Sequence, residues 1–500
     1  MIILPSPPNA TEKYLYVEGR RWLFYIFASL STVLLSSGSY VFTWANPELW
    51  LYGILVTFVF FYLLVSYLVG LKGKPFDYSR HQAIRSKWIN HMVFPTVDVY
   101  LPVCGEPYEV LENTWKYVAG LFWPEDKLNV HVLDDKPNEA NRSLAMAHGF
   151  NYIVRKDAPT LKKAGNVRNA FKETSGEFIL ILDADFCPRS EFLHETVPYM
   201  LHDEKIAIVQ TPQFFEVKKE QTWIERGAGY IQELFYRLIQ VSRNTWGASI
   251  CVGSCALYRR KALEPMGGTY PIEHSEDLHT GFSMLQQGFK LEYIPIALSK
   301  GVCPDSLAAF WTQQYRWCTG STSLATNPMF WKQKLSIMAR LSYLSGMGYY
   351  VATAMGIWLS IIPSLYMVWF APDKLVWFAI AFYGPSFLFG TLFTKLWTRA
   401  NGSIWNAMRV RQLSYYSHFA ALTDRIFKCT MPWVPTGAAS QSEKFKRSRY
   451  LMWAWSSLSF TLIMFGAGYN MDGWLDVNFY PTIFFSGFNY WLTSSILRDQ

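Results

Sequence analysis

The chain has 500 residues, of which 51% are hydrophobic and 17% aromatic, while only 17% are charged. This composition is too apolar for an ordinary soluble protein, and the length exceeds that of one typical domain. The net charge of +8 raises the question of nucleic acid, but the basic residues lie mostly beside apolar runs and no nucleic-acid-binding module is recognisable. We therefore expect no nucleic-acid partner. The seven scattered cysteines predict free thiols and no zinc site.

Six stretches without a charged residue are long enough to cross a bilayer, which takes about 20 apolar residues. They are Trp22–Trp44, Trp50–Leu71, Leu341–Pro372, Leu375–Thr394, Tyr450–Met471 and Val477–Leu497. The third is overlong and contains Pro363, so we interpret it as one span with an interfacial lead-in. The pattern predicts two spans before a polar middle segment and four after it.

Basic residues flank these spans on one side only, with few exceptions. Because basic residues collect in cytoplasmic loops, the pattern predicts that both termini are cytosolic. We expect the membrane to be the plasma membrane. Residues 1–71 would form a cytosolic stretch and two spans, residues 72–340 a cytosolic domain, and residues 341–500 four spans. Within the last part, residues 401–449 mix apolar and basic side chains, which favours an amphipathic helix on the membrane surface over a plain linker helix.

The middle segment alternates between strand and helix patterns. Strands are predicted at Val97–Val103, Leu128–Leu133, Tyr152–Val154 and Phe178–Leu182, with helices at Asn138–His148 and Gly165–Thr174. Such an alternation predicts a parallel α/β sheet, whose ligands bind where the strands end.

Acidic residues follow two of these strands. Asp134 and Asp135 end the second, and Asp183 and Asp185 follow the fourth with only Ala184 between them. Two carboxylates one residue apart lie on the same side of an extended chain. Mg²⁺ takes one or two carboxylates together with substrate phosphates, so this site would hold Mg²⁺ (or Mn²⁺) and an anion. A solvated turn is the alternative.

Six motifs follow one another in order. They are Leu133-Asp134-Asp135, Lys163-Ala164-Gly165-Asn166, Asp183-Ala184-Asp185, Cys251-Val252-Gly253-Ser254, Ser275-Glu276-Asp277 and Gln313-Gln314-Tyr315-Arg316-Trp317. In this order, and framed by the predicted spans, the chain resembles the family 2 glycosyltransferases, in particular their processive, cellulose-synthase-like branch. The resemblance implies an α/β cytosolic GT-A (Rossmann-like) domain inserted in an all-α transmembrane domain of about six helices.

The resemblance also implies a role for each motif. Asp134 or Asp135 would hold uracil, Lys163 would lie near the diphosphate, and Asp183 and Asp185 would bind ribose and metal. Asp277 would be the general base. The remaining implied contacts are Glu106 with the donor nucleotide, and Gly253, Ser254, Glu276, Gln313, Arg316 and Trp317 with the acceptor sugar and the diphosphate.

Elementary chemistry agrees with these roles, because the attacking hydroxyl must lose a proton and the departing diphosphate gains charge. Simpler explanations remain. Asp277 could be a helix N-terminal carboxylate behind a Ser275 cap, and Lys163 could be part of a solvated basic run. Trp317 could be a core or interface residue, and Gly253-Ser254 could form a tight turn before a strand at Ala256–Tyr258.

Two motifs depart from the family pattern. Val103-Cys104-Gly105-Glu106 offers no aromatic ring to the uracil, although Glu106 is retained. The region that matches a gating loop reads Phe427-Lys428-Cys429-Thr430-Met431-Pro432-Trp433, without the usual lysine and glycine. The regulation typical of bacterial cellulose synthase is therefore not expected.

The sequence thus favours a processive, inverting β-glycan synthase that uses a nucleotide sugar, with UDP-glucose as the preferred donor, and that passes its polysaccharide through the bilayer. Oligomers or accessory subunits remain open. A hyaluronan-, chitin- or mannan-type synthase and a non-processive lipid-linked sugar transferase are the enzymatic alternatives. A transporter or scaffold with an inactive cytosolic domain is the alternative from another class.

Overall fold

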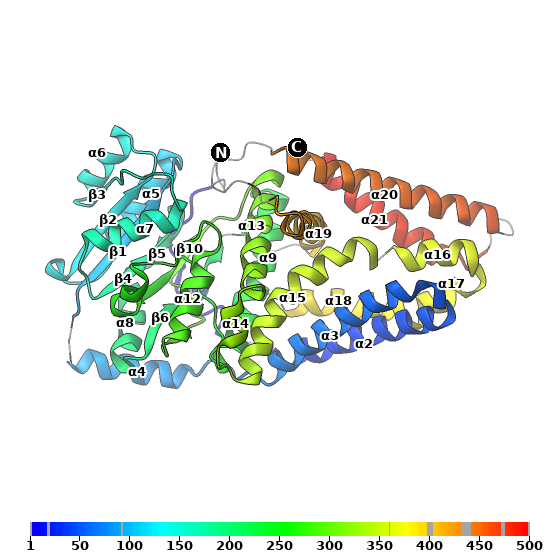
Figure 1. The fold of residues 1–500 in the computed structure, drawn as a ribbon, viewed down its shortest axis with the longest axis horizontal. Coiled ribbons are helices and arrows are strands. Elements are labelled where there is room, and N and C mark those ends of the chain that lie inside the picture. Colours follow the sequence, from blue (N-terminus) through cyan, green and yellow to red (C-terminus); the bar gives the residue numbers. More distant parts are fainter. Residues whose placement is uncertain are drawn as a thin grey trace.

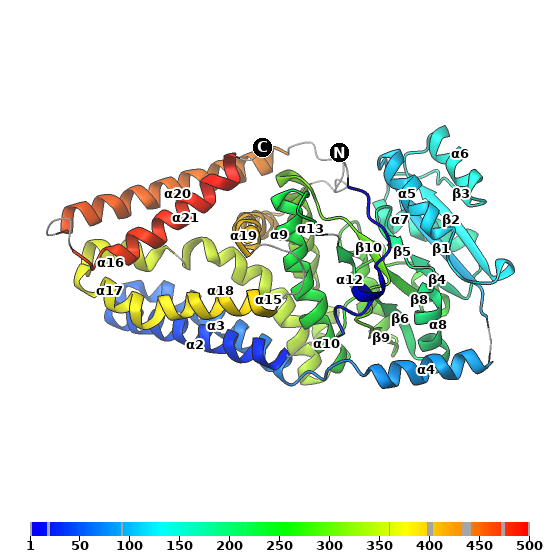
Figure 2. The same cartoon turned by 180° about the vertical axis from the view of Figure 1, so that it is seen from behind.

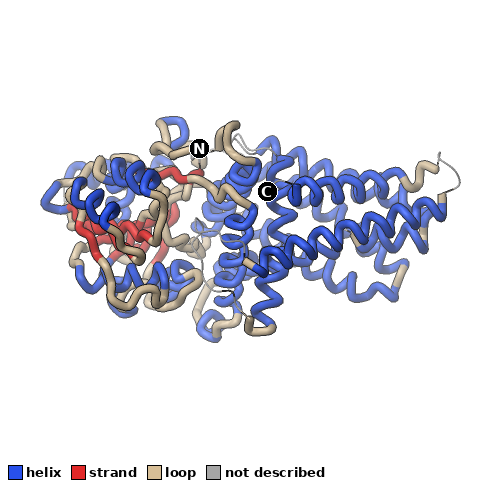
Figure 3. The backbone as a smooth tube through the Cα atoms, turned by 90° about the horizontal axis from the view of Figure 1, so that it is seen from above, coloured by secondary structure: helices blue, strands red, loops and turns tan. Residues whose placement is uncertain are grey.

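A computed structural model of the chain describes residues 3–17, 21–91, 94–215, 217–359, 361–397, 404–429, 431, 442–471 and 476–498. The strands gather at one end of the elongated molecule, and long helices make up the other end (Figure 3). This division follows the composition of the chain, since the polar middle segment forms the sheet-containing part and the apolar runs form the helices.

The main sheet has seven strands in the order β3-β2-β1-β4-β8-β6-β9. Their bounds are β1 Val97–Val103, β2 Leu128–Asp134, β3 Asn151–Ile153, β4 Phe178–Ile181, β6 Ile206–Gln210, β8 Ala256–Arg259 and β9 Lys290–Tyr293. The pairs among β1 to β4 are parallel, as predicted, but β8 runs antiparallel to both of its neighbours. The predicted purely parallel sheet is therefore wrong, because the chain enters β8 from the opposite end.

Both faces of this sheet are covered by helices, which explains why β4 is apolar at every position. Ile179 and Ile181 pack with Val167 of α7 (Lys162–Glu173) on one face. Phe178 and Leu180 face the cluster that contains α5 (Tyr108–Val118) and α8 (Phe192–His202). All four β4 side chains are buried, as expected for a central strand of a three-layer α/β domain. The short helix α6 (Glu139–Ala147) connects β2 and β3.

The N-terminal segment, residues 3–17, lies along this domain (Figure 2). It passes a second, three-stranded sheet in the order β5 (Cys187–Pro188), β10 (Ser299–Gly301) and β7 (Phe214–Phe215). The short helix α1 (Ala10–Lys13) begins with a capping box formed by Asn9 and Glu12.

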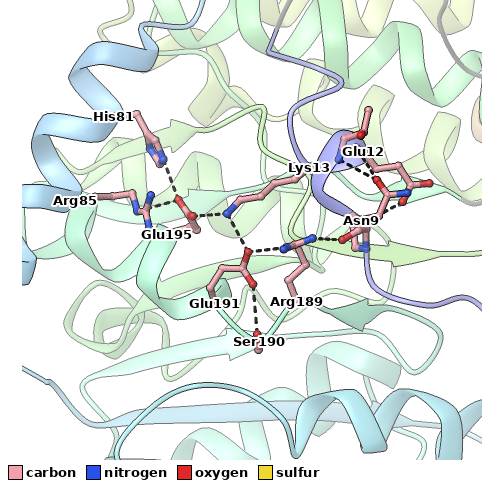
Figure 4. Close-up of polar contacts among 11 residues, drawn as sticks. Asn9, Glu12, Lys13, His81, Arg85, Arg189, Ser190, Glu191 and Glu195 are labelled. Atoms are coloured by element: carbon pink, nitrogen blue, oxygen red, sulfur yellow. Dashed lines mark hydrogen bonds and ion pairs between the residues drawn. The ribbon is translucent and has the colours of Figure 1, made fainter.

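Lys13 of this segment reaches into a buried cluster of charges (Figure 4). Its Nζ lies 2.6 Å from Glu195 and 3.0 Å from Glu191. Glu195 also pairs with His81 at 2.9 Å and Arg85 at 3.2 Å, both from α4 (Tyr78–His91). One carboxylate on α8 thus joins the segment before the first predicted span to the helix after the second.

Helices occupy all six stretches predicted to cross the membrane. They are α2 (Arg21–Ala45), α3 (Trp50–Leu71), α15 (Ile337–Leu359) with α16 (Ile362–Phe370), α17 (Leu375–Phe378) continuing through a π-helical turn into α18 (Gly384–Trp397), α20 (Glu443–Asn470) and α21 (Tyr480–Arg498). Within the described residues, four candidates are long and apolar enough to span a bilayer: Arg21–Ala45, Pro47–Leu71, Ile337–Phe370 and Glu443–Asn470. The count of six therefore stays a prediction. Pro363 lies in the first turn of α16, where a proline is tolerated.

Three helices separate the sheet from the long helices: α9 (Trp223–Leu234), α13 (Leu307–Ala325) and α19 (Ile404–Ile426) (Figure 1). Residues 401–449 were predicted to contain an amphipathic helix, and α19 fills much of that range. It contacts α9, α13, α15 and α20, so it is buried on several sides. Its position relative to a membrane surface stays a prediction, and much of the gating-like loop at 427–437 lies outside the described residues.

Candidate active site

Asp183, the first of the two aspartates that follow β4, is held by the loop before the neighbouring strand β8. The backbone N–H of Asp183 donates a hydrogen bond of 2.8 Å to Oγ of Ser254, just before β8. Lys163, in the first turn of α7, donates to the Asp183 carboxylate and also, at 2.9 Å, to the carbonyl oxygen of Gly253. Three of the predicted motifs therefore meet at one point, which the antiparallel approach of β8 makes possible.

Asp277 joins this point through Gly253. The backbone of Gly253 has φ +76°, and a Cβ added there would lie 3.1 Å from Oδ2 of Asp277. Asp277 lies in the first turn of α12 (Glu276–Gln286), and its Oδ1 accepts a 2.8 Å hydrogen bond from the N–H of Leu278. Ser275 precedes the helix in a left-handed conformation and makes no side-chain cap. The alternative of a Ser275 cap is therefore wrong, although Asp277 does benefit from the helix N-terminus.

Helix α13 presents the remaining motif on one face. Gln313, Arg316 and Trp317 are partly exposed, whereas Trp311, Tyr315 and Cys318 on the opposite side are buried. One turn further along this face, Gly320 is buried, and a Cβ added there would clash with Oγ of Ser275. This contact places α13 against the start of α12.

Arg316 lies within electrostatic range of Glu276 and Asp183. Burial lowers the pKa of its guanidinium to about 10, against the opposing effect of these two carboxylates, so the group keeps its charge at neutral pH. Trp317 is partly exposed rather than a core residue, which leaves part of the ring free for contact.

The carboxylates here outnumber the cations. Burial, then the charge of Asp183, raises the pKa of Asp185 to about 7. Burial, then the charge of Glu276, raises the pKa of Asp277 to about 7. Burial also raises the pKa of Glu106 and Glu276. A cluster of this kind is stabilised by an added positive charge.

The basic partner of these carboxylates is Lys163. Burial alone would lower the pKa of the Lys163 ammonium, but Asp183, Glu276 and Asp277 outweigh this effect and raise it. Lys163 is therefore charged and belongs to the cluster, which favours the predicted site over a solvated basic run.

The donor set fits a hard divalent cation that also binds substrate phosphates. Among the described residues, no group of three or more His, Cys, Asp or Glu side chains is arranged to hold a metal ion alone. Mg²⁺ or Mn²⁺ needs only one or two carboxylates when phosphate oxygens complete its shell, and Asp183 and Asp185 supply two.

Asp134 is engaged by protein donors. Its side chain is fully buried and accepts hydrogen bonds from Asn141 at 2.9 Å, from Tyr152 at 2.8 Å and from the N–H of Lys136 at 2.8 Å. These contacts hold the end of β2 in place.

Asp135 forms a two-point ion pair with Arg155, with distances of 2.6 Å to Nε and 2.7 Å to Nη2. The sequence interpretation missed Arg155, whose place just after the third predicted strand was the only signal. Glu106 interacts electrostatically with both Asp134 and Asp183, so the ends of β1, β2 and β4 lie near one another.

A second network that the sequence interpretation missed contacts the side of α13 that carries Tyr315. Tyr315 donates a 2.6 Å hydrogen bond to Asp424, near the end of α19, and Asp424 pairs with Lys444 at 2.5 Å. Lys444 lies in the first turn of α20. This network fixes the residue beside Arg316 to two helices of the C-terminal part.

Comparison with known proteins agrees with this geometry. Residues 178–393 match the family model described as "Glycosyl transferase family group 2". The chain is 35% identical over 307 residues to the cellulose synthase 1 catalytic subunit (UDP-forming) of Komagataeibacter xylinus, covering 60% of this chain and 41% of that protein. It is 33% identical over 260 residues to the cellulose synthase catalytic subunit (UDP-forming) of Xanthomonas axonopodis pv. citri, covering 51% and 35%. The chain thus spans less than half the length of these relatives.

A solved structure supports the fold. The chain resembles a mannosyltransferase from Pyrobaculum calidifontis, solved with GDP-Man and Mn²⁺, with a TM-score of 0.53 and 15% identity over 76% of this chain and 100% of that one. At this identity the likeness shows a GT-A-like fold and nothing of the substrate. Taken together, the comparisons show that residues 178–393 match a family 2 glycosyltransferase model and that the chain is similar, over half or more of its length, to cellulose synthase catalytic subunits.

Proposed function

We propose that the chain polymerises a β-linked glucan from UDP-glucose, adding one sugar at a time to the end of a growing polysaccharide. The observation that carries this proposal is the convergence of Lys163, Asp183, Asp277 and Arg316 from four separate motifs. Similarity to UDP-forming cellulose synthase subunits supports the choice of donor and product.

In this proposal Asp277 takes the proton of the acceptor hydroxyl. With its pKa raised to about 7 by burial and by Glu276, the carboxylate is a stronger base than an exposed aspartate, yet is substantially ionised at neutral pH. The acceptor oxygen attacks the anomeric carbon of the donor sugar while the bond between this carbon and the diphosphate breaks. The proton stays on Asp277. A single displacement of this kind inverts the anomeric centre, so an α-linked donor gives a β-linked product.

The departing UDP gains negative charge, which the cationic side chains of Arg316 and Lys163 would stabilise. Asp183 and Asp185 would hold Mg²⁺ or Mn²⁺, which supplies further positive charge at the diphosphate. Glu106 would contact the donor nucleotide, and Asp134 and Asp135 would shape the uracil site through the end of β2.

The acceptor would lie along the face of α13 that carries Gln313 and Trp317. This face also touches the start of α12, and α13 packs against α15 and α19 on the side of the long helices. The partly exposed Trp317 ring offers a flat apolar surface to a sugar ring. Gly253 and Ser254 let the backbone approach the acceptor closely, because glycine needs no space for a side chain.

We also propose that the product leaves through the helical part of an integral membrane protein whose catalytic domain and termini are cytosolic. Arg411 of α19 supports this idea: it is exposed, yet it interacts electrostatically with Tyr62 of α3, Tyr349 of α15 and Tyr415 of its own helix. An accessible arginine among helices of this kind faces a hydrated space rather than lipid. Tyrosine hydroxyls and a guanidinium offer hydrogen bonds to the hydroxyl groups of a passing glycan.

A purified full chain in detergent or nanodiscs tests the proposal through release of nucleoside diphosphate. UDP-glucose, UDP-N-acetylglucosamine, UDP-glucuronate and GDP-mannose would be compared with Mg²⁺ or Mn²⁺, and the product would be sized and digested with linkage-specific β-glucanases. Turnover of UDP-glucose into a long, β-glucanase-sensitive polymer is expected. Turnover of another donor alone would contradict the choice of donor, and single-sugar products would contradict processivity.

Asp277→Asn is expected to lower turnover by about 10²–10⁴-fold in this assay, whereas the matched control Asp126→Asn should leave it unchanged. Asp126 has a side chain that is 77% exposed and lies outside the candidate site. Full activity of Asp277→Asn would refute the assignment of the base.

A further inference from the structure

The beginning of α20 changes from charged to uncharged residues within a short stretch. Residues 443–449 carry five charged side chains, and from Tyr450 onward the helix is uncharged to its end at Asn470. The last turn of α21, with Leu497, lies beside this transition. Here the surface has a shallow hollow of about 280 Å³, lined by Lys446, Arg449, Tyr450, Trp453 and Leu497.

The hollow carries positive charge at its polar side. Arg449 donates a 3.3 Å hydrogen bond to the carbonyl oxygen of Leu497, and its guanidinium lies 5.7 Å from the ring centre of Phe445. Across the described residues, no carboxylate lies within ion-pair distance of Arg449. Lys446 pairs with Glu443 at 2.7 Å, but both side chains are more than half exposed, so water and salt weaken that pair.

Its other side is apolar and aromatic. Tyr450 is 69% exposed and Trp453 is 51% exposed. Tyrosine and tryptophan are enriched at the boundary between lipid and water, where an amphipathic ring contacts both. A phospholipid needs both basic side chains for its phosphate and an apolar surface for its acyl chain. Free phosphate needs only the basic side chains.

We propose that this hollow binds an anionic phospholipid, with its headgroup phosphate on Arg449 and Lys446 and the start of an acyl chain against Trp453 and Leu497. The proposal goes beyond the glycosyltransferase activity and requires only that α20 crosses a bilayer, for which it is long and apolar enough. Arg447 offers a matched control, because it is an exposed arginine on the same helix that does not line the hollow.

Native mass spectrometry of the full chain in a neutral detergent would measure binding of phosphatidylglycerol, phosphatidylcholine and inorganic phosphate. A basic residue near a lipid headgroup contributes about a fivefold change in affinity. Arg449→Gln should therefore weaken phosphatidylglycerol binding about fivefold or more, while Arg447→Gln should change it less than about twofold. Phosphatidylcholine should bind more weakly than phosphatidylglycerol, and inorganic phosphate should not displace the lipid.

Equal losses in Arg449→Gln and Arg447→Gln would overturn the proposal, because they would indicate diffuse attraction to the whole basic end of α20. Displacement of the lipid by inorganic phosphate would also overturn it, since the site would then recognise a free anion. Should Arg449→Gln fail to give monodisperse protein, Lys446→Gln replaces an exposed side chain without disturbing the helix contact. Its binding of phosphatidylglycerol must still fall relative to Arg447→Gln for the proposal to stand.

Discussion

Gly253 and Asp277 are in direct contact, so closely that a Cβ on Gly253 would lie 3.1 Å from both Cβ and Oδ2 of Asp277. The contact joins the loop before β8 to the start of α12. Since Gly253 also accepts the hydrogen bond of Lys163, one backbone position links the proposed base to the proposed diphosphate site.

Replacing Gly253 with alanine is therefore expected to lower kcat by displacing Asp277. The substitution also places alanine at φ +76°, which costs about 1–2 kcal/mol of stability. Gly247→Ala separates the two effects, because Gly247 has φ +63° with nothing within 4 Å of an added Cβ. Both variants should lose similar stability in thermal unfolding, while only Gly253→Ala should lose turnover. Equal loss of turnover in both would mean that backbone strain alone is responsible.

Turnover should fall as the pH decreases through about 7. Burial and the charge of Glu276 raise the pKa of Asp277 to about 7, and a general base acts only in its deprotonated form. The rate at saturating donor should thus reach a plateau above this pH and decline below it. Above this pH, Asp277→Asn should lower the rate by about 10²–10⁴-fold, and the difference from the parent should narrow at lower pH, where the base of the parent is protonated.

Glu276→Gln should move this acidic limb to lower pH. Removing the neighbouring negative charge lowers the pKa of Asp277, because the charge of Glu276 opposes its ionisation. The midpoint of the pH–rate profile measures this shift, whatever the change in the maximum rate. A midpoint that stays in place would show that another group controls the acidic limb.

Removal of divalent cations with EDTA should stop UDP release, and Mg²⁺ or Mn²⁺ should restore it. Asp185→Asn should raise the metal concentration needed for half-maximal rate, since one of two carboxylate ligands is lost. The variant should unfold at a temperature no lower than the parent in the absence of metal, because burial and Asp183 disfavour the charge of Asp185. Unchanged metal dependence would exclude Asp185 as a ligand.

The strands and the acidic residues at their ends could be predicted from the sequence, because buried strands and polar strand ends leave a local sequence pattern. β1 and β2 begin where they were predicted, and the helix predicted at Gly165–Thr174 is α7, which begins earlier at Lys162. The direction of β8 could not be predicted, since the hydrophobicity pattern indicates a strand but not its direction in the sheet. Only the antiparallel β8 brings Gly253 and Ser254 beside Asp183.

Contacts between segments that are distant in the sequence could not be predicted either. Lys13 and Glu195 are 182 residues apart, and neither is part of a motif. Asp135 and Arg155 lie 20 residues apart, yet the acidic pair looked from the sequence like free ligands. Whether a charged side chain is free or engaged depends on tertiary packing, which single-sequence patterns do not encode.

Asp135→Asn should destabilise the catalytic domain. Arg155 has a fully buried side chain and forms a two-point pair with Asp135, so the variant leaves a buried guanidinium with less neutralising charge. Breaking a buried ion pair from one side costs about 3–5 kcal/mol. Chemical denaturation should show this loss, whereas Asp126→Asn should be neutral because its side chain is 77% exposed. Comparable stability of both variants would contradict the structural role of Asp135.

Lys13→Met should release the N-terminal segment from the catalytic domain. The ammonium of Lys13 is held between Glu191 and Glu195. Against the effect of burial, Lys13 lowers the pKa of Glu191, and His81 together with Lys13 lowers that of Glu195. Because the folded pKa values lie below the ordinary ones, this stabilisation is present above the ordinary glutamate pKa and is lost as the pH falls through the folded values.

Limited proteolysis at neutral pH measures the release directly. Cleavage within residues 3–17 should be faster in Lys13→Met than in the parent chain, because Glu195 is then left buried with only His81 and Arg85. Lys116→Met is the control, since Lys116 is an exposed residue of α5 without a carboxylate partner in the described part of the chain. If the segment is cleaved equally fast in both variants, the charge cluster of Lys13, Glu191 and Glu195 does not hold it, and its other contacts, such as the ion pair of Glu12 with Lys300, are sufficient.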